Sequence, residues 1–201
     1  ENLIAGIALV KVRATFQEGM MKKTQFIIAC SLIMASGSAL AMGFTAEQGK
    51  NFTNLNMEIG KSSSGLYAES NWIKNTQDGS QLGGVGVGYN LALGPLTANI
   101  GTKAVYLGPK KGDNGVAFPI GGGIDLALTD SIHMYGEGYS APEGLTNSVK
   151  NYVEANGGIS WTPLTPLTIK AGYRHASVDG KDGRPGHTII DGAYVGAGVT
   201  F

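Results

Sequence analysis

The stretch VAFPIGGGIDLALT, residues 116–129, carries the pattern that decides the fold. One face of this stretch is apolar and holds Val116, Phe118, Ile120, Ile124, Leu126 and Leu128. The other face holds small or polar residues, namely Ala117, Pro119, Gly121, Gly123, Asp125 and Thr129. Because successive side chains of a strand point to opposite sides, this alternation predicts a β-strand with one apolar face.

The same alternation recurs through most of residues 42–201. It is clear in LGGVGVGYNLAL (82–93), LTANIGTKAVYL (96–107), VEANGGISW (153–161), LTIKAGYRH (167–175) and AYVGAGVTF (193–201). The second face is mostly glycine with a few charges of both signs, whereas a water-soluble sheet usually exposes many Lys, Glu and Thr residues. A glycine-rich face suits the narrow interior of a membrane barrel. A soluble periplasmic β-protein is the alternative.

The connections between these stretches predict the strand number. Nine are expected, at 50–53, 61–64, 75–81, 94–95, 108–115, 129–131, 142–151, 163–166 and 180–191. After the first, short and long connections alternate, as in transmembrane barrels with short periplasmic turns and longer outer loops. The predicted fold is therefore all-β, a single closed antiparallel transmembrane β-barrel of ten strands. Eight strands is the alternative, if the first hairpin is one bent strand and another pair of strands merges elsewhere.

The N-terminal residues predict export. MMKKTQFIIACSLIMASGSALA (20–41) has a basic start, a short apolar run and an Ala39-Leu40-Ala41 cleavage site, which is the pattern of a secretory signal peptide. Residues 1–19 are interpreted as upstream translation, and residues 42–201 as the barrel. A lipoprotein with Cys30 lipidated is the alternative. Residues 42–201 contain 11 basic and 13 acidic residues, a balance that excludes a nucleic-acid partner.

Charged residues on the second face are predicted to point into the barrel. They are Glu47, Glu58, Glu69, Lys103, Asp125, Glu137, Glu154, Lys170 and Arg174. Six acids and three bases in a small interior must pair, since an isolated buried charge is very costly. The sequence predicts a structural ion-pair network, with a narrow, low-conductance solute path as the alternative.

Aromatic and apolar residues on the first face are predicted to meet lipid. Trp72, Tyr106 and Phe118 lie near the outer ends of their strands and Trp161 near a periplasmic end, as in interfacial aromatic belts. Val195, Ala197, Val199 and Phe201 face lipid from the last strand. Outer-membrane barrels typically end in such a strand, so the resemblance implies that the barrel-assembly machinery reads it.

Several stretches resemble the YfaZ family of Gram-negative outer-membrane proteins. They are 42–55, 93–113, 135–145 (YGEGYSAPEGL), 149–162 and 191–201. The resemblance implies an outer-membrane location in a Gram-negative bacterium, with outer-membrane lipid including lipopolysaccharide as a partner. It implies no activity, so the expected role is structural or surface interaction, non-enzymatic, as a monomer without cofactor. A metal site is not expected, because the barrel has no cysteine and its histidines are scattered: His133, His175 and His187.

One catalytic hypothesis remains. His175 and Ser177 are two residues apart, hence on one face, in an arrangement similar to that of outer-membrane lipid A deacylases, where histidine acts as base and serine as nucleophile. Asp191 is the nearest candidate to orient the histidine. The sequence departs from that pattern because no glutamate follows Glu154. The outer loops 142–151 and 180–191 either bind surface ligands or cap the barrel, and mobile caps are the usual case.

Overall fold

The computed structural model describes residues 41–61, 63–110, 114–181 and 184–201. The predicted upstream segment 1–19 and the signal peptide 20–41 lie outside the described residues, Ala41 excepted, and so does Ala39 of the predicted cleavage site.

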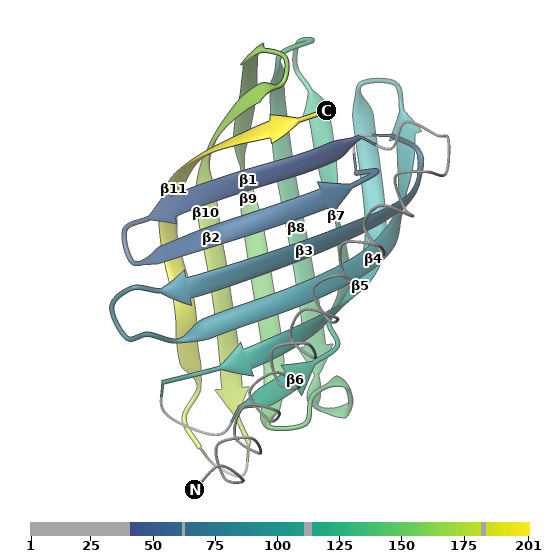
Figure 1. Ribbon diagram of the computed structural model, residues 1–201. Helices are drawn as coiled ribbons and strands as arrows, with labels where there is room; N and C mark the ends of the chain where they lie inside the picture. The colour runs from purple at the N-terminus through teal and green to yellow at the C-terminus, as the bar shows by residue number, and fades with distance from the viewer. Residues whose placement is uncertain (1–40, 62, 111–113, 182–183) are drawn as a thin grey trace, which may run out of the picture. The chain divides into compact units, whose positions relative to one another are not determined.

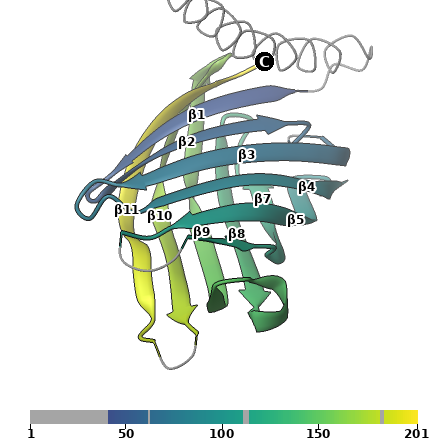
Figure 2. The same ribbon diagram turned by 60° about the horizontal axis from the view of Figure 1, so that its bottom comes forward.

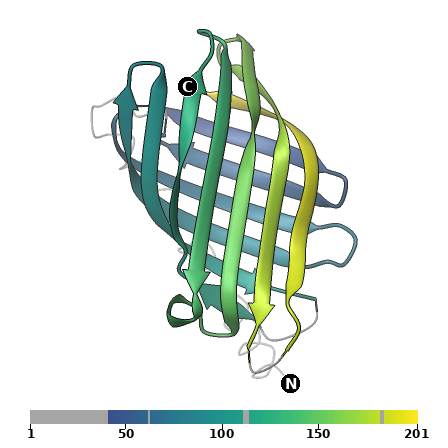
Figure 3. The same ribbon diagram turned by 180° about the vertical axis from the view of Figure 1, so that it is seen from behind.

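The described chain forms one closed antiparallel sheet (Figures 1 and 3). Its strands are β1 (Met42–Gly49), β2 (Phe52–Ile59), β3 (Gly65–Asn75), β4 (Gln81–Leu93), β5 (Leu96–Gly108), β6 (Gly115–Ala117), β7 (Ile120–Ala127), β8 (Ile132–Pro142), β9 (Val149–Leu164), β10 (Leu167–Gly180) and β11 (His187–Thr200). Consecutive strands pair, except that β6 and β7 both pair with β5, and β1 pairs with β11 from Gly43↔Thr200 to Gly49↔Tyr194, which closes the ring. A barrel without edges satisfies all its backbone hydrogen bonds internally, as a bilayer requires.

β6 and β7 together form one strand of the ring, because both pair with β5. The sequence predicts a continuous strand here, and the structure interrupts it at Phe118 and Pro119. Proline has no N–H to donate to a ladder. The Phe118 N–H donates instead to the Leu145 carbonyl at 2.8 Å, while the Pro119 carbonyl still accepts from the Lys103 N–H at 3.0 Å.

The barrel therefore has ten strands, which confirms the prediction, and the eight-strand alternative is wrong. The first hairpin consists of two strands and not of one bent strand, because β1 and β2 pair over seven positions and are joined by Lys50 and Asn51. The last connection was predicted too long, since β11 begins at His187 and not after residue 191. Ile189 and Ile190 are both buried at a register shift opposite Ala176 and Ser177, so the alternation that marks a strand is lost there.

The two ends of the barrel differ in their connections. The end that holds Phe201 has the turns 60–64, 94–95, 128–131 and 165–166, whereas the other end has the loops 76–80, 109–114, 143–148 and 181–186 and the tight turn 50–51. By the usual topology the first end is periplasmic and the second is the outer end. Figure 2 shows several of these outer-end hairpins extending beyond the slanted front strands.

The outward face of the barrel is apolar. Val85, Val87, Ile100, Ile120 and Ile124 are each more than half exposed. Large exposed apolar surfaces of this kind mark an interaction with lipid or protein. In the described part of the chain, no helix is long and apolar enough to cross a membrane.

Candidate functional site inside and around the barrel

The outer half of the barrel interior is filled by apolar side chains. We name this set the outer apolar layer: Phe52, Ile73, Leu82, Val105, Leu107, Ala117, Ala141, Val149, Tyr152, Ala176, Val178, Ile189, Ile190 and Tyr194. Nine of the eleven strands contribute residues to this layer, and nearly all of these residues lie near the outer ends of their strands. Phe52 is 1% exposed and Tyr152 is 0% exposed. The sequence predicts glycines and ions throughout the interior, and the structure differs from this prediction at the outer end. The residues of the outer apolar layer occupy inward-facing positions at the strand ends, beyond the glycine-rich centres of the strands.

The outer loops are tied down over this layer. Leu145, in the short 3-10 helix η1 (Glu143–Leu145), packs against the layer. The Asn147 side chain accepts from the Val116 N–H at 2.8 Å, and the Asn147 N–H donates back to the Val116 carbonyl. Between strand ends, Asn75 of β3 donates to the Ile189 carbonyl of β11 at 2.7 Å. The loop 143–148 thus caps the outer apolar layer through hydrogen bonds.

Beneath the outer apolar layer lies a network of ion pairs, the charged layer. Its members are Glu47, Lys61, Glu69, Lys103, Glu137, Glu154 and Arg174. Lys103 Nζ lies 2.5 Å from Glu154 Oε1 and 3.2 Å from Glu69 Oε1. Lys61 Nζ continues the chain, at 2.5 Å from Glu69 Oε2 and 3.0 Å from Glu137 Oε2. Because each buried cation contacts carboxylates directly, the charges compensate one another.

Neutral polar groups complete the charged layer. Asn54 donates to Glu47 Oε2 at 2.8 Å, beside the Arg174 guanidinium, which lies 3.1 Å from the same oxygen. The Tyr152 hydroxyl donates to Glu154 Oε2. Burial opposes the charge on Lys61, but the carboxylates of the charged layer outweigh burial, so the pKa of Lys61 is raised well above its usual value. Lys61 therefore remains protonated.

All nine charged residues predicted to point inward lie on the inward-facing side of their strands, and they differ in their ion pairs. Six belong to the charged layer, whereas Glu58, Asp125 and Lys170 lie outside its ion pairs. Asp125 instead pairs with His133 Nδ1 at 2.7 Å, in a partly exposed position. Sequence reasoning missed Lys61, because it sits in the turn 60–64 and not on a strand. Its position in the turn between β2 and β3, which carry Glu58 and Glu69, was the available signal.

Glycines make room for tyrosine rings inside the barrel. A Cβ at Gly88 would lie 2.5 Å from the Tyr67 ring, and one at Gly101 would lie 2.5 Å from the Tyr67 hydroxyl. Tyr67 in turn hydrogen-bonds Tyr139 across the interior at 3.1 Å. Aromatic rings that cover glycines on neighbouring strands fix strand register. The glycine-rich face is therefore filled by side chains from other strands.

The predicted lipid-facing residues lie on the outer wall. Trp72, Tyr106, Phe118 and Trp161 are each about half exposed, near the strand ends that the sequence indicated. Val195 and Phe201 are exposed and point away from the interior, and so do Ala197 and Val199 of the same strand.

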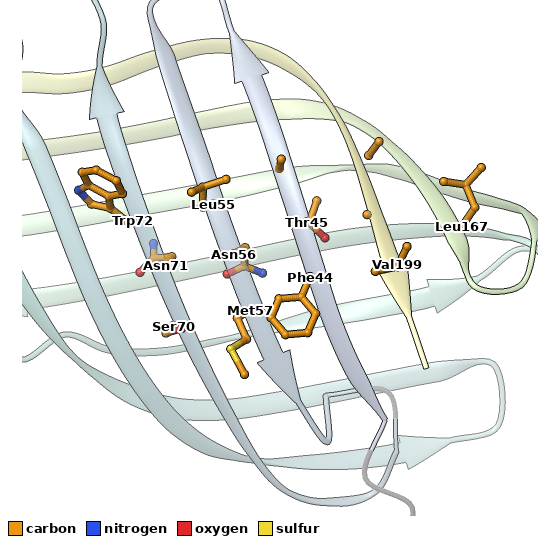
Figure 4. Close-up of a pocket in the computed structure, with 13 residues that line it drawn as sticks. Phe44, Thr45, Leu55, Asn56, Met57, Ser70, Asn71, Trp72, Leu167 and Val199 are labelled. Atoms are coloured by element: carbon orange, nitrogen blue, oxygen red, sulfur yellow. The ribbon is translucent and has the colours of Figure 1, made fainter. Parts of the chain in front are cut away.

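An apolar hollow of about 650 Å³ lies on the outer wall over β1, β2, β3, β10 and β11, and its lining residues are drawn in Figure 4. Phe44, Leu55, Trp72, Leu167 and Val199 are among its lining residues.

The three residues of the catalytic hypothesis are brought together on the outer wall. His175 Nδ1 lies 3.1 Å from Asp191 Oδ1, and His175 Nε2 lies 3.3 Å from Ser177 Oγ. Within the described residues there is no group of three or more His, Cys, Asp or Glu side chains arranged to hold a metal ion.

Comparison with known proteins gives both a family and a set of structural relatives. Residues 21–201 match the family model described as YfaZ precursor. The chain is 39% identical over 181 residues to the outer membrane protein YfaZ of Escherichia coli strain K12, covering 90% of this chain and all of the relative. None of the proteins named here is described as an enzyme.

Among solved structures, the NanC porin matches 81% of this chain and 99% of its own, with 11% identity and a TM-score of 0.46. The KdgM porin in complex with disordered oligogalacturonate matches 80% and 99%, with 13% identity and a TM-score of 0.45. The outer membrane channel DcaP of Acinetobacter baumannii matches with 14% identity and a TM-score of 0.42, and the chain spans 60% of its length. The family match over nearly the whole chain, on a closed ten-strand barrel with an apolar wall, shows that this chain belongs to the YfaZ family of outer-membrane proteins.

Proposed function

We propose that this outer-membrane barrel is closed and non-conducting, and that its role is structural or one of surface interaction. The outer apolar layer carries this proposal. A water-filled pore exposes its lining to solvent, yet Ile73, Leu82 and Leu107 are each 1% exposed within the described barrel.

The size of the barrel supports the same view. Interiors of about eight strands are just wide enough for side chains to fill, whereas open porins use about 16–18 strands. Ten strands give only a slightly wider interior, and the tyrosine rings and the charged layer occupy it below the outer apolar layer. Because the interior is filled, other molecules contact the barrel at its outer wall and its outer loops.

The proposed partners follow from the outer wall. Its exposed apolar side chains suit outer-membrane lipid, including lipopolysaccharide, around a monomer. The last strand, with Val195, Ala197, Val199 and Phe201 facing outward, suits recognition by the barrel-assembly machinery during insertion.

A narrow solute channel is the competing function, and single-channel recording in planar bilayers separates the two. We expect no discrete current steps from the native barrel under an applied voltage. A variant with Phe52→Ala and Leu107→Ala removes two large side chains of the outer apolar layer and serves as the control for detecting a small opening. Discrete, protein-dependent steps from the native barrel would establish the channel and reject the proposal.

A further inference from the structure

The outer wall carries a hydrogen-bonded chain of three side chains near the outer ends of β10 and β11. His175 Nε2 faces Ser177 Oγ at 3.3 Å, and His175 Nδ1 faces Asp191 Oδ1 at 3.1 Å. A serine, a histidine and a carboxylate in this order form the arrangement that activates a serine nucleophile. We propose that Ser177, His175 and Asp191 form a serine-hydrolase site that cleaves an ester-linked acyl chain of an anionic lipid in the outer leaflet.

Strand geometry holds the three side chains together. His175 and Ser177 are two residues apart on β10 and share its outward face. Asp191 is the direct cross-strand partner of His175 on β11. The Tyr173 hydroxyl donates to Asp191 Oδ1 at 2.9 Å, so the carboxylate is fixed from two directions. A carboxylate held in this way orients the imidazole, which makes Asp191 a positioning residue.

A register shift beside the site supplies a further hydroxyl. Ala176 pairs with Ile190, but Ser177 pairs with Thr188, so Ile189 is the extra residue on β11. Bulges of this kind re-aim side chains and are over-represented next to active sites. Thr188 is exposed and directly opposite Ser177, so its hydroxyl is placed to donate to an oxyanion formed there.

The position of the site along the barrel axis favours an ester of a membrane lipid as the substrate. The same outward face of β10 carries Ile169 and Tyr173 on the periplasmic side of the site and Asp179 on the loop side. The three residues therefore lie where the apolar band of the wall gives way to polar residues. Lipid acyl esters lie at the same boundary, between the hydrocarbon tails and the headgroup. His175 and Asp191 have side chains that are 39% and 52% exposed, so a lipid can reach them directly from the bilayer.

A polar cleft next to the site suits an anionic headgroup. It has a volume of about 740 Å³, lies among the outer ends of β8, β9 and β10, and includes Asp179, two residues beyond Ser177 on the same face. Lys150, Lys181 and Arg184 line it, and the other acid, Glu143, lies 3.7 Å from Lys181 Nζ. Lysine and arginine side chains bind phosphate groups, so the cleft favours a phosphorylated lipid whose acyl ester lies over Ser177.

The reaction requires only lipid and water. Ser177 Oγ attacks the ester carbonyl carbon and its proton passes to His175 Nε2. The carbonyl–oxygen bond to the headgroup alcohol then breaks, and His175 returns the proton to that alcohol, which leaves an acyl-serine. Water attacks the acyl-serine with its proton passing to His175, the carboxylic acid departs, and Ser177 recovers its proton. The sum is ester plus water giving carboxylic acid plus alcohol.

The test uses the purified full barrel in vesicles made from outer-membrane lipid extract. Released fatty acid is measured by mass spectrometry, and serine activation is measured separately by covalent labelling with a fluorophosphonate probe. We expect fatty-acid release by the native barrel and labelling at Ser177. His175→Asn is expected to lower the release rate by about 10²–10⁴-fold. Asp191→Asn is expected to lower the rate and to change its pH profile, which a merely structural residue would not do.

Matched variants decide the result. Ser177→Ala is compared with Ser70→Ala, which removes another outward-facing serine on β3, and heat-modifiable gel migration establishes that both are folded. Loss of release and of labelling in Ser177→Ala alone supports the proposal. Lipids that are identical with the native barrel and with Ser177→Ala, or a probe attached elsewhere, overturn it. This outcome is independent of the current recordings, since a closed barrel need not be a hydrolase.

Discussion

Replacing Lys103 with methionine is expected to destabilise the folded barrel by about 3–5 kcal/mol, the usual cost of removing one partner from a buried ion pair. Lys103 is 5% exposed, contacts Glu154 and Glu69, and places its Nζ 3.8 Å from the centre of the Tyr139 ring. Without the ammonium group, Glu154 is a buried carboxylate with no cation in contact among its described ion pairs. The free energy of unfolding, measured by urea titration in lipid vesicles, checks this result.

Two further variants separate the charge effect from the loss of a long side chain. Lys74→Met changes an exposed lysine on β3 and is expected to alter stability by less than about 0.5 kcal/mol. Adding Glu154→Gln to Lys103→Met removes the uncompensated carboxylate and is expected to restore part of the lost stability. If Lys103→Met unfolds at the same urea concentration as Lys74→Met, the charged layer does not hold the barrel together.

Truncating Phe52 to alanine is expected to cost about 3–5 kcal/mol, because a large side chain is removed from a packed core and leaves a cavity. Phe52 is 1% exposed and packs edge-on against Tyr194, with ring centroids 6.2 Å apart. Its ring also fills the space beside Gly49, where a Cβ would lie 2.6 Å from Phe52 Cδ1. Urea unfolding in the same vesicles measures the effect.

Phe44→Ala is the matched control for this variant. Phe44 lies on the neighbouring strand β1, is 42% exposed and faces outward, so lipid can occupy the space that its ring leaves. We expect a clearly smaller loss of stability than for Phe52→Ala. Equal losses would mean that the interior is no better packed than the lipid-facing surface, which contradicts the outer apolar layer.

The sequence predicted the ring of strands because alternation is a local property. Val85, Ile100 and Ile124 could be assigned to the outer wall from their neighbours alone, and the ten strands followed from the connections. The inside was harder to predict, because its structure depends on which strands face one another across the barrel. Tyr67 and Gly88 have no visible relation in the sequence until the barrel closes and the ring covers the glycine.

The outer apolar layer and the site on the outer wall were also hard to predict from the sequence, because both depend on how neighbouring strands pair. Ile189 and Ile190 break the alternation, so the sequence predicts a loop there, whereas the structure has a bulge at which both side chains are buried. That bulge sets the register in which Thr188 meets Ser177, whereas Asp191 meets His175 in the unbroken register that runs from Leu167↔Val199. The sequence indicated the pair His175 and Ser177 by spacing, whereas the distance to Asp191 depended on cross-strand register, which spacing does not determine.

Access of a water-soluble thiol reagent to single cysteines tests the closed interior most directly. Residues 42–201 contain no cysteine, so cysteines introduced at Ala141 and Ala176, each no more than 1% exposed, report on the outer apolar layer. A cysteine at Gln77, exposed in an outer loop, is the control. In folded barrels we predict rapid labelling at position 77 and none at 141 or 176. Labelling at 141 and 176 as fast as at 77 would show water passing through the layer and would contradict the account.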